Sequence, residues 1–79
     1  MRIHIRIHQM KGGKKVTTIE NLDTDLDLKM MCREMKRKFS CNGSVKKDDH
    51  IIMLQGDHRV SVENWLRDNE IANDIMTHG

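Results

Sequence analysis

The first residues of the chain alternate between apolar and polar side chains. Isoleucines occupy the odd-numbered positions Ile3, Ile5 and Ile7, and polar residues occupy the even-numbered positions His4, Arg6 and His8. This two-residue period predicts a half-buried strand over residues 2–8. A β-branched run over 15–22 follows the glycine pair Gly12-Gly13, which predicts an antiparallel hairpin with its tip at the glycines. Val16 and Ile19 differ in parity, so both can face the core only if a bulge intervenes.

From residue 26 to residue 39 the apolar period changes to that of a helix. The apolar residues recur at intervals of three and four: Leu28, Met31, Cys32, Met35 and Phe39. Thr24 followed by Asp27 resembles a capping box at the start of this helix. Its last turn is basic, and Asn42-Gly43 is the expected left-handed cap at its end.

The second half of the chain predicts two further strands, a helix and a final strand. Strands over 44–47 and 50–55 flank a polar turn. Asp57 is placed to cap a helix over 58–69, and the tail after it is expected to add a short strand. The order ββαββαβ predicts an α+β fold, in which two helices cover one face of a mostly antiparallel sheet. The other face of that sheet is left uncovered.

Composition limits the size and the setting of the protein. A chain of 79 residues is expected to be a single domain over 1–79. Aromatic residues make up only 3%, so the core must use Ile, Leu, Val and Met, and stacking of bases on exposed rings is disfavoured. Two cysteines do not make a disulfide framework. With neither a signal-peptide pattern nor a membrane span in the sequence, we expect a reduced, soluble, cytoplasmic protein.

Charge is divided unevenly along the chain. Residues 1–47 hold 12 Lys/Arg and 5 Asp/Glu, whereas residues 48–79 hold 2 and 7, which predicts a polyanionic partner for the first half. Two features concentrate the positive charge. The hairpin tip comprises Lys11, Gly12, Gly13, Lys14 and Lys15. The helix patch, within about a 100° arc of the first helix, comprises Lys29, Arg33, Lys36 and Arg37. The alternative is that both are merely solvated surface.

Other polar residues give weaker indications of chemistry. His4 and His8 would lie about 13 Å apart on one strand, and no CxxC or HExxH spacing occurs, so neither a metal site nor a cofactor is expected. No nucleophile and base are suitably spaced for catalysis, so we do not expect an enzyme. The stretch "LQGDHR" ends with a glycine turn before a helix, where Arg59 favours an anion site and Asp57 an ordinary helix cap.

Several of these stretches together resemble eukaryotic translation initiation factor 1, the start-codon-selection factor of the small ribosomal subunit. The resemblance rests on "IHIRI", the basic glycine hairpin, "REMKRKFSCNGSV" and "LQGDHR". It implies a two-layer α/β plait whose hairpin tip and helix patch contact ribosomal RNA near the P site. It also implies a tRNA-gating loop at Lys47, Asp48 and Asp49. The family's signature turn corresponds to Gln55, Gly56, Asp57, His58 and Arg59.

The resemblance implies a steric role in scanning rather than catalysis. Its partners would be the small ribosomal subunit and its rRNA, the initiator tRNA complex and other initiation factors, bound by a monomer without a membrane. Two departures from the family are a first strand that begins without a flexible tail and a shorter second hairpin loop. Two alternatives remain: a ribosome-recycling or general RNA-binding module of the same fold, and a plait-fold hydrolase with Arg59 and Asn42 as its only candidate residues.

Overall fold

The computed structural model describes residues 2–79. Its elements follow the order ββαββαβ, which confirms the predicted fold class. The strands are β1 (Ile3–Gln9), β2 (Lys15–Glu20), β3 (Gly43–Lys46), β4 (Ile51–Gln55) and β5 (Ile75–Thr77). The helices are α1 (Leu28–Phe39) and α2 (Arg59–Asp68), with a short 3-10 turn, η1 (Lys11–Gly13), at the hairpin tip.

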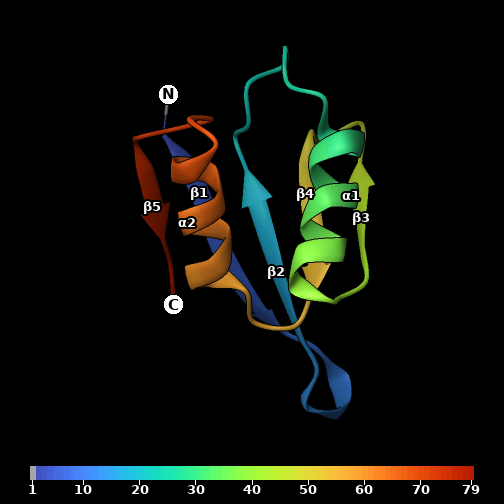
Figure 1. Cartoon of the computed structure of the whole chain (residues 1–79). Helices are drawn as coiled ribbons and strands as arrows, with labels where there is room; N and C mark the ends of the chain where they lie inside the picture. Colours follow the sequence, from blue (N-terminus) through green and yellow to red (C-terminus); the bar gives the residue numbers. More distant parts are fainter. Residues whose placement is uncertain (1) are drawn as a thin grey trace.

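The five strands form one sheet in the order β3-β4-β2-β1-β5. Neighbours are antiparallel except for β1 and β5, which run parallel. Both helices lie on the same face of the sheet, as the two-layer prediction requires (Figure 1). The core between the layers contains the predicted α1 stripe and the apolar face of α2, and its fully buried members include Ile5, Ile19, Met31, Met35, Ile52, Leu54, Val62 and Leu66.

No bulge interrupts β2, so Val16 and Ile19 lie on opposite faces of the sheet. Pairing with β1 runs without interruption from Gln9↔Lys15 to His4↔Glu20. Thr17 and Ile19 therefore share the helix-facing side and are both fully buried, whereas Val16 lies on the open side of the sheet. A threonine can take this core position because its hydroxyl donates to the Gly56 carbonyl at 2.7 Å and accepts from the His58 amide at 2.9 Å.

The ends of α1 differ from the sequence-based prediction. The Asp27 carboxylate accepts from the Met30 amide at 3.1 Å, so Asp27 is the N-cap and Thr24 is not. At the other end the left-handed residue is Ser40, with φ of 53°, rather than Asn42-Gly43. Gly43 already belongs to β3, where a Cβ would lie 2.7 Å from a side-chain carbon of Leu54. This glycine therefore permits the close approach of β3 to β4 instead of ending the helix.

The start of α2 also lies one residue later than expected. His58 occupies the N-cap position without a side-chain cap, and the helix begins at Arg59. The Asp57 carboxylate still accepts from the Arg59 amide, at 3.3 Å, but mainly binds the Arg59 guanidinium. The prediction of Asp57 as the helix cap was therefore wrong by one position, because an ion pair competes for its oxygens.

Candidate polyanion-binding surface

The β1–β2 hairpin extends beyond the end of the sheet and carries its lysines into solvent (Figure 1). Gly12 and Gly13 have φ of 74° and 76°, a conformation that other residues rarely adopt. A Cβ at either glycine would meet nothing within 4 Å, so the space beside both glycines is open. Lys11, Lys14 and Lys15 are all exposed. The hairpin tip thus presents three cations on a narrow backbone that a bulky ligand can approach.

The base of the hairpin is held by the turn between β4 and α2. The Gly56 amide donates to the Lys15 carbonyl at 2.7 Å, and the Gln55 amide donates to the Asn42 carbonyl at 2.8 Å. Thr17 binds the same turn through its hydroxyl. Because the bonds from Lys15 and Thr17 join segments about 40 residues apart, they fix the direction in which the hairpin leaves the sheet.

The helix patch runs along the outer side of α1. Lys29, Arg33 and Arg37 are exposed and Lys36 is half-buried. The eight residue steps from Lys29 to Arg37 span about 12 Å at 1.5 Å per residue. The carboxyl end of α1 lies at the same end of the molecule as the hairpin tip (Figure 1). The fold therefore brings the last turn of the helix patch toward the hairpin tip and leaves Lys29 at the other end.

Ion pairing separates the cations of residues 2–79 into two groups. Five of them pair with a carboxylate: Arg2, Arg6, Lys46, Arg59 and Arg67. The remaining nine make no ion pair within those residues: Lys11, Lys14, Lys15, Lys29, Arg33, Lys36, Arg37, Lys38 and Lys47. Every predicted cation of the hairpin tip and helix patch is in this second group. Sequence reasoning omitted Lys38 from the patch, although the run "KRK" and its exposure point to it.

The predicted gating loop is the β3–β4 turn, at the opposite end of the sheet from the hairpin tip (Figure 1). Lys47, Asp48 and Asp49 are exposed there, and Asp49 lies 3.7 Å from Lys46. The His50 ring binds the carbonyl of Asp23 at 2.8 Å and so ties the turn to the segment before α1. The structure thus keeps the gating loop and the hairpin tip apart.

The signature turn is occupied by its own internal contacts. Gly56 has φ of 103°, and the His58 ring lies 2.8 Å from the Gln55 carbonyl while stacking on Phe39 at 5.7 Å. These contacts close the turn over the end of α1. They give Gln55, Gly56 and His58 a structural role at the base of the hairpin.

Arg59 is likewise engaged within the protein. Its Nε and one terminal nitrogen donate to the Asp57 carboxylate at 2.9 and 2.7 Å, and the other terminal nitrogen donates to the His78 carbonyl at 3.0 Å. The hydrogen bonds from Arg59 lower the pKa of Asp57 to about 2. Because its donors are directed at Asp57 and the C-terminal segment, Arg59 is poorly placed to bind an external anion or a hydrolase substrate.

The described part of the chain offers little other chemistry. No three His, Cys, Asp or Glu side chains within residues 2–79 gather as a metal site. Burial raises the pKa of both thiols, Cys32 and Cys41, which disfavours the reactive thiolate. No helix in residues 2–79 has the length and apolar character needed to cross a bilayer.

The fold and this surface define a class of protein: a small α/β plait with a concentration of lysines and arginines that make no ion pair within residues 2–79 and can therefore bind a polyanion. The family model described as "Translation initiation factor SUI1" matches residues 1–72, and the chain belongs to this family. The resemblance seen in the sequence is thereby confirmed.

Individual relatives agree with the family assignment. "Protein translation factor sui1" of Schizosaccharomyces pombe is 45% identical over 67 residues, covering 81% of this chain and 62% of that protein. "Eukaryotic translation initiation factor 1" of Homo sapiens is 38% identical and covers 98% of this chain and 73% of its own length. A "Protein translation factor SUI1 homolog" of Acanthamoeba polyphaga mimivirus is 38% identical, with 99% and 79% coverage. The matched region thus covers between 62% and 79% of the length of these three relatives.

Proposed function

We propose that this protein promotes scanning and accurate start-codon selection by binding the small ribosomal subunit near its P site. The observation that carries the proposal is the distribution of unpaired cations over the hairpin tip and the helix patch. Cations without a carboxylate partner are available to neutralise phosphates, and release of counterions from RNA then supplies binding free energy. Because the chain belongs to the initiation-factor family, we take the polyanion to be ribosomal RNA.

The proposed mechanism is steric and requires no bond to be made or broken. The protein acts as one rigid cytoplasmic domain, without cofactor or metal, and as a monomer. The hairpin tip and the last turn of α1 hold it on the rRNA. The β3–β4 turn, with Lys47, Asp48 and Asp49, lies at the far end and faces the initiator tRNA. Premature accommodation of that tRNA is opposed until the start codon pairs, after which the factor leaves.

The test is sedimentation with purified small ribosomal subunits at several salt concentrations. Lys14→Glu with Lys15→Glu should weaken binding and lower the salt slope by about one unit for each phosphate that is no longer neutralised. The matched control is Arg2→Glu with Arg67→Glu, which makes the same change in charge at exposed, ion-paired positions elsewhere. Equal weakening by both variants, or no binding of the unmodified protein at low salt, would refute the proposal.

A further inference from the structure

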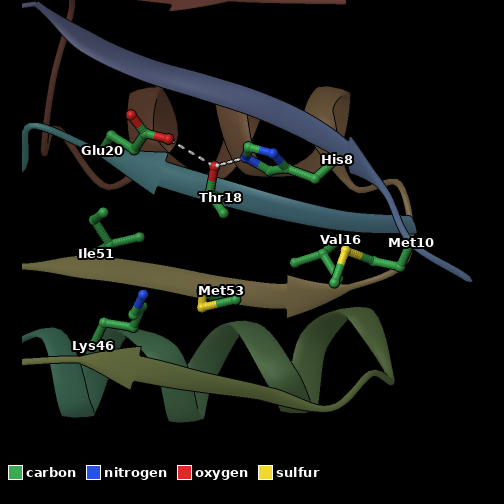
Figure 2. Close-up of a pocket in the computed structure, with 8 residues that line it drawn as sticks. All are labelled: His8, Met10, Val16, Thr18, Glu20, Lys46, Ile51 and Met53. Carbon is green, nitrogen blue, oxygen red and sulfur yellow. Dashed lines mark hydrogen bonds between the residues drawn. The ribbon is translucent and has the colours of Figure 1, made fainter. Parts of the chain in front are cut away.

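The sheet face opposite the helices carries an apolar pocket that the proposed RNA contacts do not use. Four apolar side chains line it: Met10, Val16, Ile51 and Met53. Figure 2 shows them along β2, β4 and the end of β1, with Met53 between Ile51 and Val16. The hollow that they line has a volume of about 310 Å³. Met10 is 50% exposed, and the other three are half-buried. Nothing in residues 2–79 covers these side chains, which leaves the pocket open to an apolar group from outside the protein.

Polar residues at the edge of this pocket are held in place by contacts with one another. The His8 ring lies 3.0 Å from the Thr18 hydroxyl, which donates to Glu20 at 3.0 Å (Figure 2). Glu20 also pairs with Arg6 at 3.2 Å, so its charge is offset within the wall. On the other side stands Lys46, whose only ion pair in the described chain is an exposed contact of 3.7 Å. The one cation directed at the pocket is therefore weakly held by the protein itself.

The pocket continues as a groove toward the base of the hairpin. Two adjoining hollows share Val16 with it, and the larger, of about 420 Å³, is lined also by Lys14 and Lys15. Lys46 lies opposite Ile51 at one end of β4, and Val16 lies opposite Gln55 at the other. The four residue steps from Ile51 to Gln55 along β4 span about 13 Å. The groove thus has an apolar floor about 13 Å long, with Lys46 beside one end and Lys14 and Lys15 lining the hollow at the other.

We propose that this groove binds an extended, acidic peptide segment of a partner protein. One large apolar side chain of the segment enters the pocket beside Met53, and acidic side chains two residues before and two residues after it lie near Lys46 and the Lys14–Lys15 pair. In an extended chain, residues i, i+2 and i+4 point to the same side and span about 13 Å, which matches the length of the apolar floor along β4. Methionines adapt to the shape of the entering side chain.

The other occupants fit less well. Bases stack best on Phe, Tyr or Trp, and Phe39 and Trp65, the only such residues in the chain, belong to the helix layer on the other side of the sheet. The one ring that lines the pocket, His8, is held by its contact with Thr18. A second copy of the protein would bring the lysines at the two ends of one groove against those of the other, which repels. An acidic segment instead complements these charges. The inference goes beyond the proposed function, because the pocket around Met53 lies on the face opposite the helix patch. Only Lys14 and Lys15, at the end of the groove, belong also to the hairpin tip.

The peptide is tested by NMR titration of the isotope-labelled full chain. The probe is a blocked seven-residue peptide with the pattern Gly-Glu-Ser-Trp-Ser-Glu-Gly. We expect shifts of the backbone amides of Val16, Ile51 and Met53. Two matched peptides, one with Ser for Trp and one with Gln for both Glu, should bind at least tenfold more weakly. Equal binding of all three peptides, or shifts confined to the helix patch, would overturn the proposal.

Variants of the protein locate the contact. Met53→Glu should weaken the peptide at least tenfold, whereas Met76→Glu, at a 38% exposed methionine on the same face but out on edge strand β5, should change it less than twofold. If Met53→Glu does not fold, Lys46→Glu at an exposed position serves instead, with the same expected loss. Unaltered peptide binding in the folded variant would refute the groove as the site.

Two further measurements separate this proposal from its competitors. A heptamer of uridine that shifts the groove amides, or shifts that grow with protein concentration without any ligand, would replace the peptide with RNA or with a second copy. In the sedimentation assay, Met53→Glu should still bind small ribosomal subunits. Loss of subunit binding there would place the groove in the RNA interface and overturn the inference. Failure of the unmodified protein to bind subunits, with peptide binding intact, would overturn only the proposed function.

Discussion

Thr17 shows how much one side chain contributes to the arrangement of the site. Its hydroxyl is fully buried, donates to the Gly56 carbonyl and accepts from the His58 amide. A polar group in the core is stable there only because both bonds are made. Through them the signature turn is joined to β2 just beside Lys15, where the hairpin begins.

Thr17→Val keeps the shape of the side chain and removes both bonds. Leaving the half-buried Gly56 carbonyl and His58 amide without these partners should lower the free energy of unfolding by about 1–3 kcal/mol. A domain of this size loses about 4–8 °C in Tm for each kcal/mol. Thr77→Val, which removes an exposed hydrogen bond to Glu63, is the control and should change the free energy of unfolding by less than about 0.5 kcal/mol. Similar losses in urea unfolding of both variants would contradict this role of Thr17.

His78 makes the stability of the protein depend on pH near neutrality. Its Nε2 lies 2.8 Å from Nδ1 of His4, and the two rings stack. Burial, together with Arg6 and His4, lowers the pKa of His78 below its usual value of 6.5, against a smaller opposing effect of Glu20. The unfolded chain then binds this proton more readily than the folded one. The contribution of neutral His78 is present above pH 6.5 and is lost as the pH falls through the lowered folded pKa.

We therefore expect the urea midpoint to fall between about pH 7 and about pH 5. In His78→Gln the fall should be smaller, because the titrating ring has gone. Asp57 and Glu63, whose pKa values are lowered, remain ionised over this range and do not obscure the comparison. Equal pH dependence of the two proteins would show that His78 is not the responsible group.

At the scale of the element, α1 combines a buried stripe, a basic outer side and an N-cap. The cap at Asp27 competes with the capping box that Thr24 suggests, and the structure selects Asp27. Both residues are exposed, so their substitution changes capping without disturbing the core.

Asp27→Ala should lower the free energy of unfolding by about 0.5–2 kcal/mol, the usual cost of losing an N-cap. Thr24→Ala should lower it by less than about 0.5 kcal/mol, because this residue makes no capping bond. Urea unfolding of the two variants decides between the alternatives. A larger loss for Thr24→Ala would restore the capping box.

For the whole molecule, the question is whether the hairpin tip and the end of α1 bind one RNA surface together. They come from separate elements but lie at the same end of a rigid domain (Figure 1). Separate groups that contact different phosphates contribute additively to the free energy of binding.

Lys36→Glu with Arg37→Glu should weaken subunit binding, and adding Lys14→Glu with Lys15→Glu should weaken it further by about the sum of the two effects. The measurement is the affinity for small ribosomal subunits at one fixed salt concentration. The Tm of each variant serves as the control for folding. A quadruple variant no weaker than either double variant would show that the two groups do not bind RNA at the same time.

The sequence alone determined the order of the elements, the apolar stripe of α1 and the positions of the basic residues. These are local properties, since periodicity and charge can be counted along the chain. The resemblance carried by "CNGSV" and "LQGDHR" added the family, and hence the plait.

Only the tertiary structure decided the helix caps, the face on which Val16 lies and which cations keep no carboxylate partner. It also showed that the signature turn is held by Thr17, which is 39 residues from Gly56 along the chain. Parity placed Val16 and Ile19 on opposite faces but could not say which faced the core, because that depends on hydrogen bonds to a distant turn. Residues that are far apart in the sequence and meet through packing produce no periodic pattern in either segment. Their contacts can therefore be identified only from the folded structure.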